Sequence, residues 1–448
     1  MENNNEIVVA LDIGTTKIVA MAGRKDVNGK LEILGTGKVE SVGVIRGVVS
    51  NIEKTVKAIS DAIAEAEHRS GLEIGVINVG IAGQHIKSLQ HRGIHTRSSI
   101  HDEIAHSDID SLINDMYKLA LPPGDKIIHV IPQEYIVDSE QGIVDPVGMS
   151  GVRLEANFHI ITGQITAIKN LQKCVEKSKL EMAGLTLEPI ASSAAVLSKE
   201  ETEAGIALVD IGGGTTDIAI FHEGIIRHTA VIPFGGNVIT KDIKEGCSVM
   251  QQQAEKLKVK FGSAMASEIE ENRIITIAGL KGHPHKEISE RNLAHIIQAR
   301  MEEIIDQVYW EIRKSGFDRK LSGGIVLTGG GALLKNLAKL VELRTGLNAR
   351  TGIPVEHLAH GYEKEVASPV FSTAIGLVLK GFEDIENGKV RQFTGSYSGN
   401  QISKTTTVST AKQTQGVNKK DPQKSNWLDK IYQRTRQWFE SEPDADLK

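Results

Sequence analysis

The sequence predicts an α/β fold with two lobes, an inserted subdomain, a flexible linker and a C-terminal amphipathic helix. Apolar β-branched runs alternate with amphipathic helical stretches from residue 6 to about residue 390, as layered α/β folds require. A degenerate repeat indicates two related lobes, because IVVALDIGTTKIVAMAG near residue 7 is echoed by IALVDIGGGTTDIAIFHEG near residue 206. After residue 388 the composition turns to Ser, Thr, Gln, Asn, Gly and Lys, which cannot bury a core.

Length and composition exclude several classes of protein. A chain of 448 residues is expected to form two or three compact units. Its 52 basic and 57 acidic residues give a net charge of −5, so nucleic acid is not an expected partner. Cys174 and Cys247 are far apart, and the 15 histidines form no metal signature, so neither a disulfide framework nor a zinc site is predicted. No apolar run approaches the ~20 residues of a spanning helix, and no export signal is present; a cytoplasmic protein is expected.

The first copy of the repeat predicts a hairpin with acidic and hydroxyl groups at its tip. A nucleoside triphosphate with its metal needs backbone N–H groups and hydroxyls near phosphate oxygens, and carboxylates near the cation. In this copy Gly14 permits a tight turn, while Thr15 and Thr16 can donate hydrogen bonds. Lys17 can meet phosphate charge, or be a solvated strand residue, and Asp12 can hold metal-bound water.

The second copy supplies an equivalent set of groups. Its residues are Asp210, Gly212, Gly213, Gly214, Thr215 and Asp217. The glycines let the backbone approach phosphates, and the two carboxylates face the cation or its waters, although Asp217 could instead only pin the hairpin. One such hairpin is commonly just structural. Two matched copies roughly 200 residues apart indicate a clamp that grips one triphosphate from both lobes.

A third glycine-rich turn lies in IVLTGGGALLKNL, residues 325–337. A strand leads into Gly329, Gly330 and Gly331, and an amphipathic helix is expected to follow, as in a nucleotide contact at a helix N-terminus. Alone, the run would equally suit a plain β-α turn. Neither Walker A spacing nor a GxGxxG fingerprint with an acidic ribose partner is present, which argues against P-loop and Rossmann folds.

Five motifs in order resemble the ATPase core of the actin superfamily. They are DIGTTK (12–17), EPIASSAAVL (188–197), DIGGGTTD (210–217), TGGGALL (328–334) and SPVFSTAIGL (368–377). The resemblance implies that the phosphates of ATP lie between the two hairpins, with Mg²⁺ held through bound water by Asp12 and Asp210. It places adenosine on Gly329–Gly331, with help from Glu255 and Lys258.

The resemblance also gives Glu188 the position at which relatives orient the attacking water or metal-bound waters. Glu188 could instead cap the helix that Pro189 begins. Hydrolysis of ATP is expected to be slow or absent.

Within the superfamily the chain resembles the FtsA family of bacterial cell division proteins over nearly its whole length. The segments GVIRGVVSNIEKTVKAISDAI, VGIAGQHI, PQEYIVD and LEPIASSAAVL carry this resemblance, together with the C-terminal helix. It implies an ATP-binding protein that polymerises, binds the C-terminal peptide of FtsZ and tethers FtsZ filaments to the cytoplasmic face of the inner membrane. It also implies a place at the division site and recruitment of later division proteins.

The resemblance and the composition together predict the domain boundaries. Lobe I is expected at 6–190, with 88–164 as its inserted subdomain, and residues 365–387 are expected to return to it. Lobe II is expected at 191–364, with a small subdomain at 227–305. The linker is expected at 388–425 and the amphipathic helix at 426–440. In the FtsA family the contacts with FtsZ belong to the small subdomain of lobe II. Helices are predicted at 51–69 and 168–182.

The segment SNWLDKIYQRTRQWFE regains large apolar residues at helical spacing. Its apolar arc consists of Trp427, Leu428, Ile431, Tyr432, Trp438 and Phe439, flanked by Lys430, Arg434 and Arg436. Such a helix would lie in the headgroup plane of a membrane with its cations toward anionic lipid. Docking on the protein's own body or on a partner's groove also requires an apolar stripe, but a long polar linker favours lipid.

Other functions on the same fold stay open from the sequence. A sugar or acetate kinase would need a catalytic base and a polar substrate pocket, and no loop indicates one. A pilus-assembly actin homologue would share the same core motifs. A chaperone ATPase is disfavoured, since no β-rich peptide-binding domain follows the core.

Overall fold

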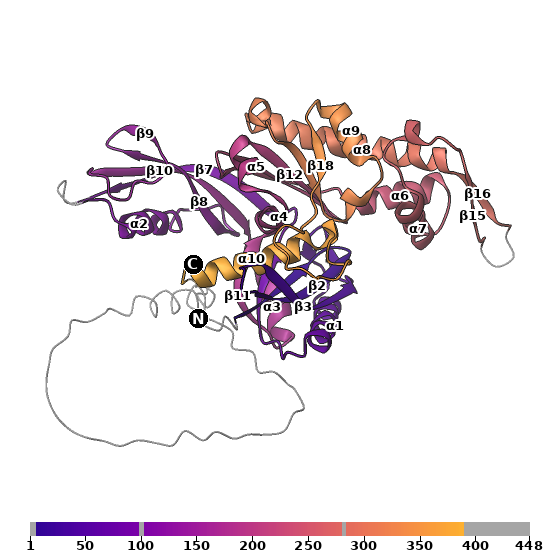
Figure 1. Cartoon of the computed structure of the whole chain (residues 1–448), viewed down its shortest axis with the longest axis horizontal. Helices are drawn as coiled ribbons and strands as arrows, with labels where there is room; N and C mark the ends of the chain where they lie inside the picture. Colours follow the sequence, from indigo (N-terminus) through magenta and orange to yellow (C-terminus); the bar gives the residue numbers. More distant parts are fainter. Residues whose placement is uncertain (1–5, 98–102, 280–283, 389–448) are drawn as a thin grey trace, which may run out of the picture. The chain divides into compact units, whose positions relative to one another are not determined.

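The computed structural model describes residues 6–97, 103–279 and 284–388 as a mixed α/β protein (Figure 1). The linker and the amphipathic helix that the sequence predicts beyond residue 388 lie outside these residues. No helix in the described ranges is both long and apolar enough to cross a membrane.

Lobe I is built on a five-stranded sheet with the order β11-β6-β1-β2-β3. Its strands are β1 (Ile7–Ile13), β2 (Lys17–Lys25), β3 (Leu31–Glu40), β6 (Val76–Ile81) and β11 (Glu181–Leu187). A small hairpin of β4 (Val44–Ile45) and β5 (Val48–Val49) precedes the first helix. The helices α1 (Ile52–Ser70) and α3 (Ile165–Lys177) bury their apolar sides against one face of the sheet.

The helix predicted at 51–69 is present, and Asn51 caps it by accepting a 3.0 Å hydrogen bond from the Lys54 amide. The helix predicted at 168–182 is present as α3, but it begins earlier, at Ile165, and the prediction is wrong at its C-terminal end. The helix stops at Lys177, and Lys179 adopts a left-handed conformation with φ of 61°, so the chain turns and continues as β11.

Lobe II repeats the architecture with a sheet of order β14-β13-β12-β17-β18. Its strands are β12 (Ile206–Ile211), β13 (Thr216–His222), β14 (Ile225–Ile232), β17 (Gly324–Thr328) and β18 (Ala349–Thr351). The helices of this lobe are α5 (Lys199–Ala204), α6 (Gly236–Gly246), α7 (Gln251–Phe261), α8 (Glu290–Lys314) and α9 (Leu337–Thr345), with a hairpin of β15 (Ile274–Ile277) and β16 (Lys286–Ser289) before α8. A core between α6–α9 and one face of the sheet holds the lobe together.

Two helices, α4 (Glu188–Val196) and α10 (Ser372–Glu386), share a single core with the other faces of both sheets. They cross so closely that a Cβ atom on Gly376 would lie 1.8 Å from the Ala191 carbonyl oxygen. Only glycine fits at this crossing, which brings the N-terminus of α4 beside the first strands of both lobes.

The inserted subdomain is a four-stranded antiparallel sheet with the order β7-β10-β8-β9. Its elements are β7 (Ile86–Thr96), α2 (His106–Met116), β8 (Asp125–Val137), β9 (Glu140–Ile143) and β10 (Arg153–Gln164). They enclose a separate core that includes Leu112, Leu154 and Phe158. The sheet occupies residues 86–164, compared with the predicted subdomain at 88–164.

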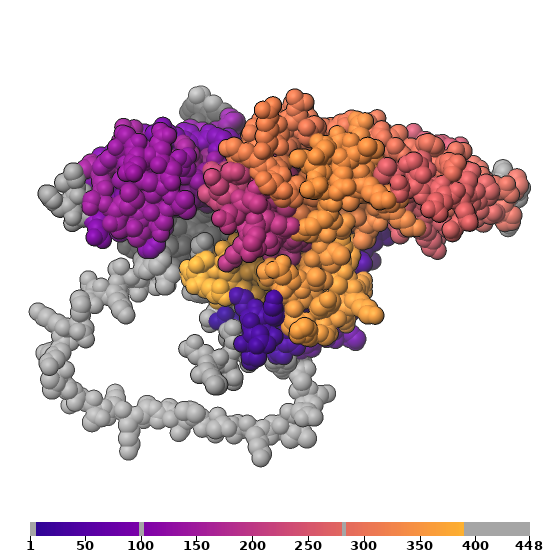
Figure 2. All heavy atoms as spheres, turned by 45° about the horizontal axis from the view of Figure 1, so that its top comes forward, coloured from indigo at the N-terminus to yellow at the C-terminus, as the bar shows by residue number. Residues whose placement is uncertain are grey.

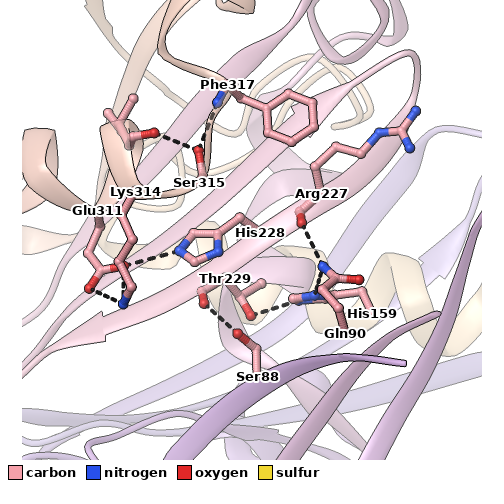
Figure 3. Close-up of polar contacts among 11 residues, drawn as sticks. Ser88, Gln90, His159, Arg227, His228, Thr229, Glu311, Lys314, Ser315 and Phe317 are labelled. Atoms are coloured by element: carbon pink, nitrogen blue, oxygen red, sulfur yellow. Dashed lines mark hydrogen bonds and ion pairs between the residues drawn. The ribbon is translucent and has the colours of Figure 1, made fainter. Parts of the chain in front are cut away.

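The inserted subdomain also bonds to β14 of lobe II, in a contact that we term the seam (Figure 3). Ser88 Oγ on β7 donates to the Thr229 carbonyl oxygen at 3.1 Å, and Gln90 Nε2 donates to the Arg227 carbonyl oxygen at 3.3 Å. The side chain of His159, on β10, also takes part in the seam. Its two ring nitrogens lie 3.0 Å from Thr229 Oγ1 and 3.2 Å from Gln90 Nε2.

Gln133 of β8 extends the seam, since its Nε2 atom lies within hydrogen-bonding distance of the carbonyl oxygens of Ile226, at 3.0 Å, and Arg227, at 3.2 Å. Because side chains alternate along a strand, His228 points the opposite way from Thr229 and contacts Glu311 of α8 at 3.1 Å (Figure 3). β14 is an edge strand, and the side chains of the inserted subdomain cover three of its carbonyl groups.

Candidate nucleotide site

The two predicted hairpins are present and have matching turns. In the first, the Gly14 amide donates to the Lys17 carbonyl oxygen at 3.0 Å. In the second, the Gly212 amide donates to the Thr215 carbonyl oxygen at 2.9 Å. Each turn begins two residues after an aspartate that is the last residue but one of a buried strand, Asp12 in β1 and Asp210 in β12. The repeat in the sequence therefore corresponds to a repeat in backbone geometry.

The tips of the hairpins face each other across the space between the lobes. A Cβ atom on Gly213 would lie 2.2 Å from Thr16 Cγ2, and one on Gly214 would lie 2.5 Å from Thr15 Oγ1. Thr15 Oγ1 also accepts a hydrogen bond of 3.1 Å from the Gly47 amide, which fixes the threonine side chain. Glycine is therefore required at 213 and 214 for the second hairpin to approach the first.

A cavity of about 50 Å³ lies between these tips. The sequence-predicted residues that line it are Asp12, Gly14, Thr15, Thr16, Lys17, Glu188, Asp210, Gly212, Gly213, Gly214, Thr215, Asp217, Gly329 and Gly330. Ligand pockets for molecules of nucleotide size commonly measure roughly 300–1,000 Å³. The described chain thus has a closed cleft, and a nucleotide would enter only if the lobes separate.

Three buried aspartates line the cleft. Asp12 is 2% exposed, and its carboxylate forms an ion pair with Lys17 Nζ at 2.6 Å. Asp210 accepts a hydrogen bond from the Ser192 hydroxyl at 2.8 Å, and burial raises its pKa above the ordinary value. Asp217 accepts a bond from the Thr215 hydroxyl at 2.9 Å through Oδ2, whereas its buried Oδ1 has no partner among the residues described.

The pKa of Asp217 is raised to about 7, first by burial and then by the neighbouring carboxylate of Asp210. Asp217 both pins its hairpin through Thr215 and presents one unpaired oxygen atom. The two interpretations open from the sequence are therefore compatible.

Glu188 is the first residue of α4 and lies at the same cleft. The N-terminus of α4 has no side-chain cap, so the capping role considered from the sequence is not observed. Burial raises the pKa of Glu188 well above its ordinary value, and the carboxylates of Asp12, Asp217 and Asp210 raise it further. The carboxyl group of Glu188 therefore keeps its proton to a higher pH than an exposed glutamate does.

The third glycine turn is shaped differently from the prediction. After β17 the chain forms a short 3₁₀ turn, Gly330–Leu333, and α9 begins only at Leu337. Gly329 has a φ of 79°, and a Cβ atom there would lie 2.3 Å from Asp210 Oδ1, so glycine is needed beside the carboxylate. Gly331 packs on Ile211 and does not line the cavity.

Glu255 and Lys258 lie one layer outside the cavity, on α7. Lys258 Nζ contacts the Gly236 carbonyl oxygen at 2.9 Å and Glu255 Oε2 at 2.8 Å. The Gly236 amide in turn donates to the Gly212 carbonyl oxygen at 2.9 Å. The pair thus supports the start of α6 behind the second hairpin.

Hydroxyl groups behind Asp210 were missed as site residues in the sequence. Ser192 Oγ lies 2.8 Å from Asp210 Oδ2, and Thr373 Oγ1 lies 3.5 Å from the same oxygen atom. Both residues stand in segments that resemble superfamily motifs, EPIASSAAVL and SPVFSTAIGL, and that resemblance was the available signal. They hold the carboxylate from the side of α4 and α10.

Comparisons with known proteins decide the family. A family model described as cell division protein FtsA matches residues 207–376, and a model of the SHS2 domain inserted in FtsA matches residues 83–162. Cell division protein FtsA of Pseudomonas aeruginosa is 39% identical over 89% of this chain and 95% of its own length. The chain belongs to the FtsA family. FtsA of Neisseria meningitidis is 40% identical over 88% of this chain and 96% of that protein, and FtsA of Escherichia coli K12 is 34% identical over 86% and 93%.

Solved structures agree with the actin-like fold that the sequence predicts for this chain. A PilM–PilN complex of type IV pilus biogenesis matches with a TM-score of 0.62 at 15% identity, over 84% of this chain and 98% of that one. MreB5 of Spiroplasma citri bound to AMPPNP matches with a TM-score of 0.52 at 15% identity, over 86% and 99%. The sequence relatives are cell division proteins, so the prediction of an FtsA-type division protein is confirmed and the kinase and pilus-assembly alternatives are not supported.

Proposed function

We propose that this member of the FtsA family binds ATP with Mg²⁺ in the cleft between its lobes and tethers FtsZ filaments to the cytoplasmic face of the inner membrane. The observation that supports nucleotide binding best is the pair of matching hairpin tips in contact across the cleft, Gly213 on Thr16 and Gly214 on Thr15. Two phosphate-binding turns that face each other are suited to grip one polyphosphate chain from both sides. MreB5, which shares the fold, was solved with AMPPNP.

The groups at the tips fit a triphosphate. The Gly14 and Gly212 amides close their turns, but the amides that follow them at both tips and the hydroxyls of Thr15 and Thr16 can donate to phosphate oxygens. Lys17 is paired with Asp12 at 2.6 Å in the closed cleft, so binding phosphate would transfer that cation from the aspartate to the nucleotide. The adenosine would lie beyond Gly329–Gly331, toward Glu255 and Lys258.

The carboxylates fit Mg²⁺ held through water. No group of three or more His, Cys, Asp and Glu side chains within the described residues is placed to hold a metal ion directly. The unpaired Oδ1 of Asp217 and the closely spaced carboxylates of Asp12 and Asp210 would instead receive metal-bound water. The bound ion would supply positive charge that neutralises the phosphates. Glu188 would orient water at the cleft, with hydrolysis at most slow.

A calorimetric titration with ATP–Mg²⁺ tests this site. Gly213→Val would drive a side chain into Thr16 and is expected to weaken ATP binding at least tenfold, because the second turn could no longer approach the phosphates. Gly75→Ala is the matched control, since a Cβ atom there meets nothing within 4 Å. Failure of the folded wild-type chain to bind ATP would overturn the proposal.

The membrane role depends on the segment beyond the described residues. Its apolar arc of Trp427, Leu428, Ile431, Tyr432, Trp438 and Phe439, with Lys430, Arg434 and Arg436 at its borders, suits an interfacial helix on anionic lipid. The linker at 388–425 would give the helix reach, and self-association into filaments would add avidity. Membership of the FtsA family supports the C-terminal peptide of FtsZ and later division proteins as partners, at the division site.

Recruitment of labelled FtsZ to anionic vesicles tests this role. The full chain with ATP is expected to bring FtsZ to the vesicles, whereas a chain that ends at Ser425 is expected to keep its affinity for ATP and lose recruitment. Vesicles of zwitterionic lipid are the control for charge. Undiminished recruitment by the shortened chain would show that the C-terminal segment is not the tether.

A further inference from the structure

A small chamber adjoins the nucleotide cleft. Its volume is about 10 Å³, and it shares Ile13, Gly47, Ala82 and Glu188 with the lining of the cleft. The β4–β5 hairpin, the end of β6 and α3 complete its wall. Of the residues that line the chamber, only His85 and Glu188 have polar side chains. The chamber therefore joins one group of the candidate site to one histidine outside it.

His85 is buried without a hydrogen-bond partner. The residue is only 3% exposed, and neither nitrogen of its ring has a partner among the described residues. Burial lowers its pKa to about 4, so the ring is neutral at pH 7 and carries one donor and one acceptor. Leaving such groups unpaired costs about 1–3 kcal/mol each, and the chamber beside the ring is where a partner can be accommodated.

The size and chemistry of the chamber match one water molecule. A buried water needs a volume of roughly 10–15 Å³ and at least two polar partners. Glu188 supplies one partner from the side of the cleft, and the glycine at position 80 gives its side chain room, because a Cβ atom there would lie 3.1 Å from Glu188 Cγ. His85 supplies the other partner. We propose that His85 and Glu188 bind one water molecule between them in this chamber, which makes His85 a positioning residue of the nucleotide site.

The location of His85 would let this water link the nucleotide cleft to the inserted subdomain. His85 lies in the neck of the inserted subdomain, between the end of β6 at Ile81 and the start of β7 at Ile86. A Cβ atom on Gly163, at the other strand of the neck, would lie 3.6 Å from His85 Cδ2. The wall contributed by α3 follows directly from that strand. A displacement of the Glu188 side chain on nucleotide binding would therefore be passed through one hydrogen-bonded water to His85, and so to both sides of the neck.

Two measurements on the nucleotide-free wild-type chain test the site directly. A high-resolution crystal structure should show a water within hydrogen-bonding distance of a His85 nitrogen and of the Glu188 carboxyl group. Nitrogen NMR of histidine-labelled protein should show His85 neutral, in one tautomer, with hydrogen-bonded shifts. A dry chamber, or tautomers in fast exchange, would overturn the proposal.

Variants test the positioning role. His85→Leu is expected to lower the preference for ATP over ADP about fivefold, the equivalent of one hydrogen bond, and to remove nucleotide-dependent differences in hydrogen exchange at the neck. His85→Gln can still bond the water and should stay within about twofold of the wild type. His91→Leu, an exposed position on β7, is the control. Equal behaviour of the Leu variant and the wild type, or no rescue by Gln, would refute the role.

The effect on affinity rests on the proposed nucleotide site, but the water does not. If the wild-type chain bound neither ATP nor ADP, the proposed function would fail, while the crystal structure and the NMR spectra would still decide whether His85 and Glu188 hold a water. If the chain bound ATP and the chamber were dry, only this inference would fail.

Discussion

Two buried histidines lie at the two attachments of the inserted subdomain, and they differ in their hydrogen bonds. His85, in the neck that joins lobe I, has no partner on either ring nitrogen among the described residues. His159, in the seam with lobe II, is 1% exposed and has a partner on both nitrogens, Thr229 Oγ1 and Gln90 Nε2. Burial is the leading cause that lowers the pKa of each ring to about 4. Burial and pKa alone therefore do not distinguish the two residues.

The difference between them concerns what each ring bonds to. His159 is satisfied by the protein itself and specifies how the inserted subdomain sits on β14 (Figure 3). His85 is satisfied only by something that enters the chamber. Both rings lie in the interior, because His85 is 3% and His159 1% exposed. Figure 2 shows the purple spheres of the inserted subdomain next to those of lobe II on the face turned to the viewer. A fully bonded histidine indicates architecture, and an unbonded one beside a cavity indicates a binding role.

The largest expected effect separates the two histidines at pH 7. His159→Leu leaves the Thr229 hydroxyl and the Gln90 amide without their buried partner and should lower the free energy of unfolding by about 2–3 kcal/mol. His85→Leu removes a ring that bonds no described residue; loss of the proposed water contact and relief of the other unpaired nitrogen should largely offset each other, so the change should be less than about 1 kcal/mol. Urea unfolding of both variants measures this. Equal losses would contradict the comparison.

Acid should destabilise the wild type relative to both variants, because each variant lacks one buried histidine. Each folded-state pKa of about 4 lies below the unfolded value of 6.5, so the unfolded chain binds protons that the folded chain excludes between these values. Stability is therefore lost as the pH falls from 6.5 toward 4, by about 2 kcal/mol per histidine at pH 5.

At pH 5 His85→Leu should consequently have a higher free energy of unfolding than the wild type. His159→Leu, which is less stable than the wild type at pH 7, should be about as stable as the wild type at pH 5. Unfolding curves at both pH values measure the difference, with His91→Leu as the control. An unchanged pH dependence in both variants would show that neither ring is excluded from protonation.

A smaller effect is expected from Thr229→Val. The substitution keeps the shape of the side chain and removes the hydroxyl that contacts His159 Nε2, at a cost of about 1 kcal/mol. In the double variant with His159→Leu this cost should disappear, because the partner is already gone. Additive effects in this double-mutant cycle would mean that the contact contributes no coupling.

The smallest effect is expected from Ser88→Ala, at the side of the seam. The Thr229 carbonyl oxygen would lose a 3.1 Å hydrogen bond, which should cost about 0.5 kcal/mol and increase hydrogen exchange along β14 and β7. Exchange in the core of lobe II should be unchanged. Increased exchange throughout lobe II would show that the seam is not a local contact.

The sequence predicted the parts of the site that depend on local pattern. Two hairpins with an aspartate before a glycine turn can be seen in a single segment each, and their repetition predicted that they act together. Long-range pairing could not be seen in this way. His159 and Thr229 are 70 positions apart, and nothing near either residue indicates the contact.

His85 shows the same limit. Its sequence neighbourhood, GIAGQHIKS, is typical of a turn after a strand. The chamber arises only when Gly80, α3 and Glu188 come together in space. The end of α3 was placed wrongly because a single left-handed residue, Lys179, outweighs the helical periodicity that continues past it.

The position of α10 in the chain bears on the order in which the protein matures on the ribosome. The sheet of lobe II uses the continuous stretch from Ile206 to Thr351, so it can be completed as soon as that stretch has emerged. The strands of lobe I are made first, but Val8 and Ala10 share their core with Ala374 and Val378 of α10, which is the last helix of the described residues to be translated. The N-terminal lobe of this protein must therefore wait, partly uncovered, until nearly the whole folded region has been synthesised.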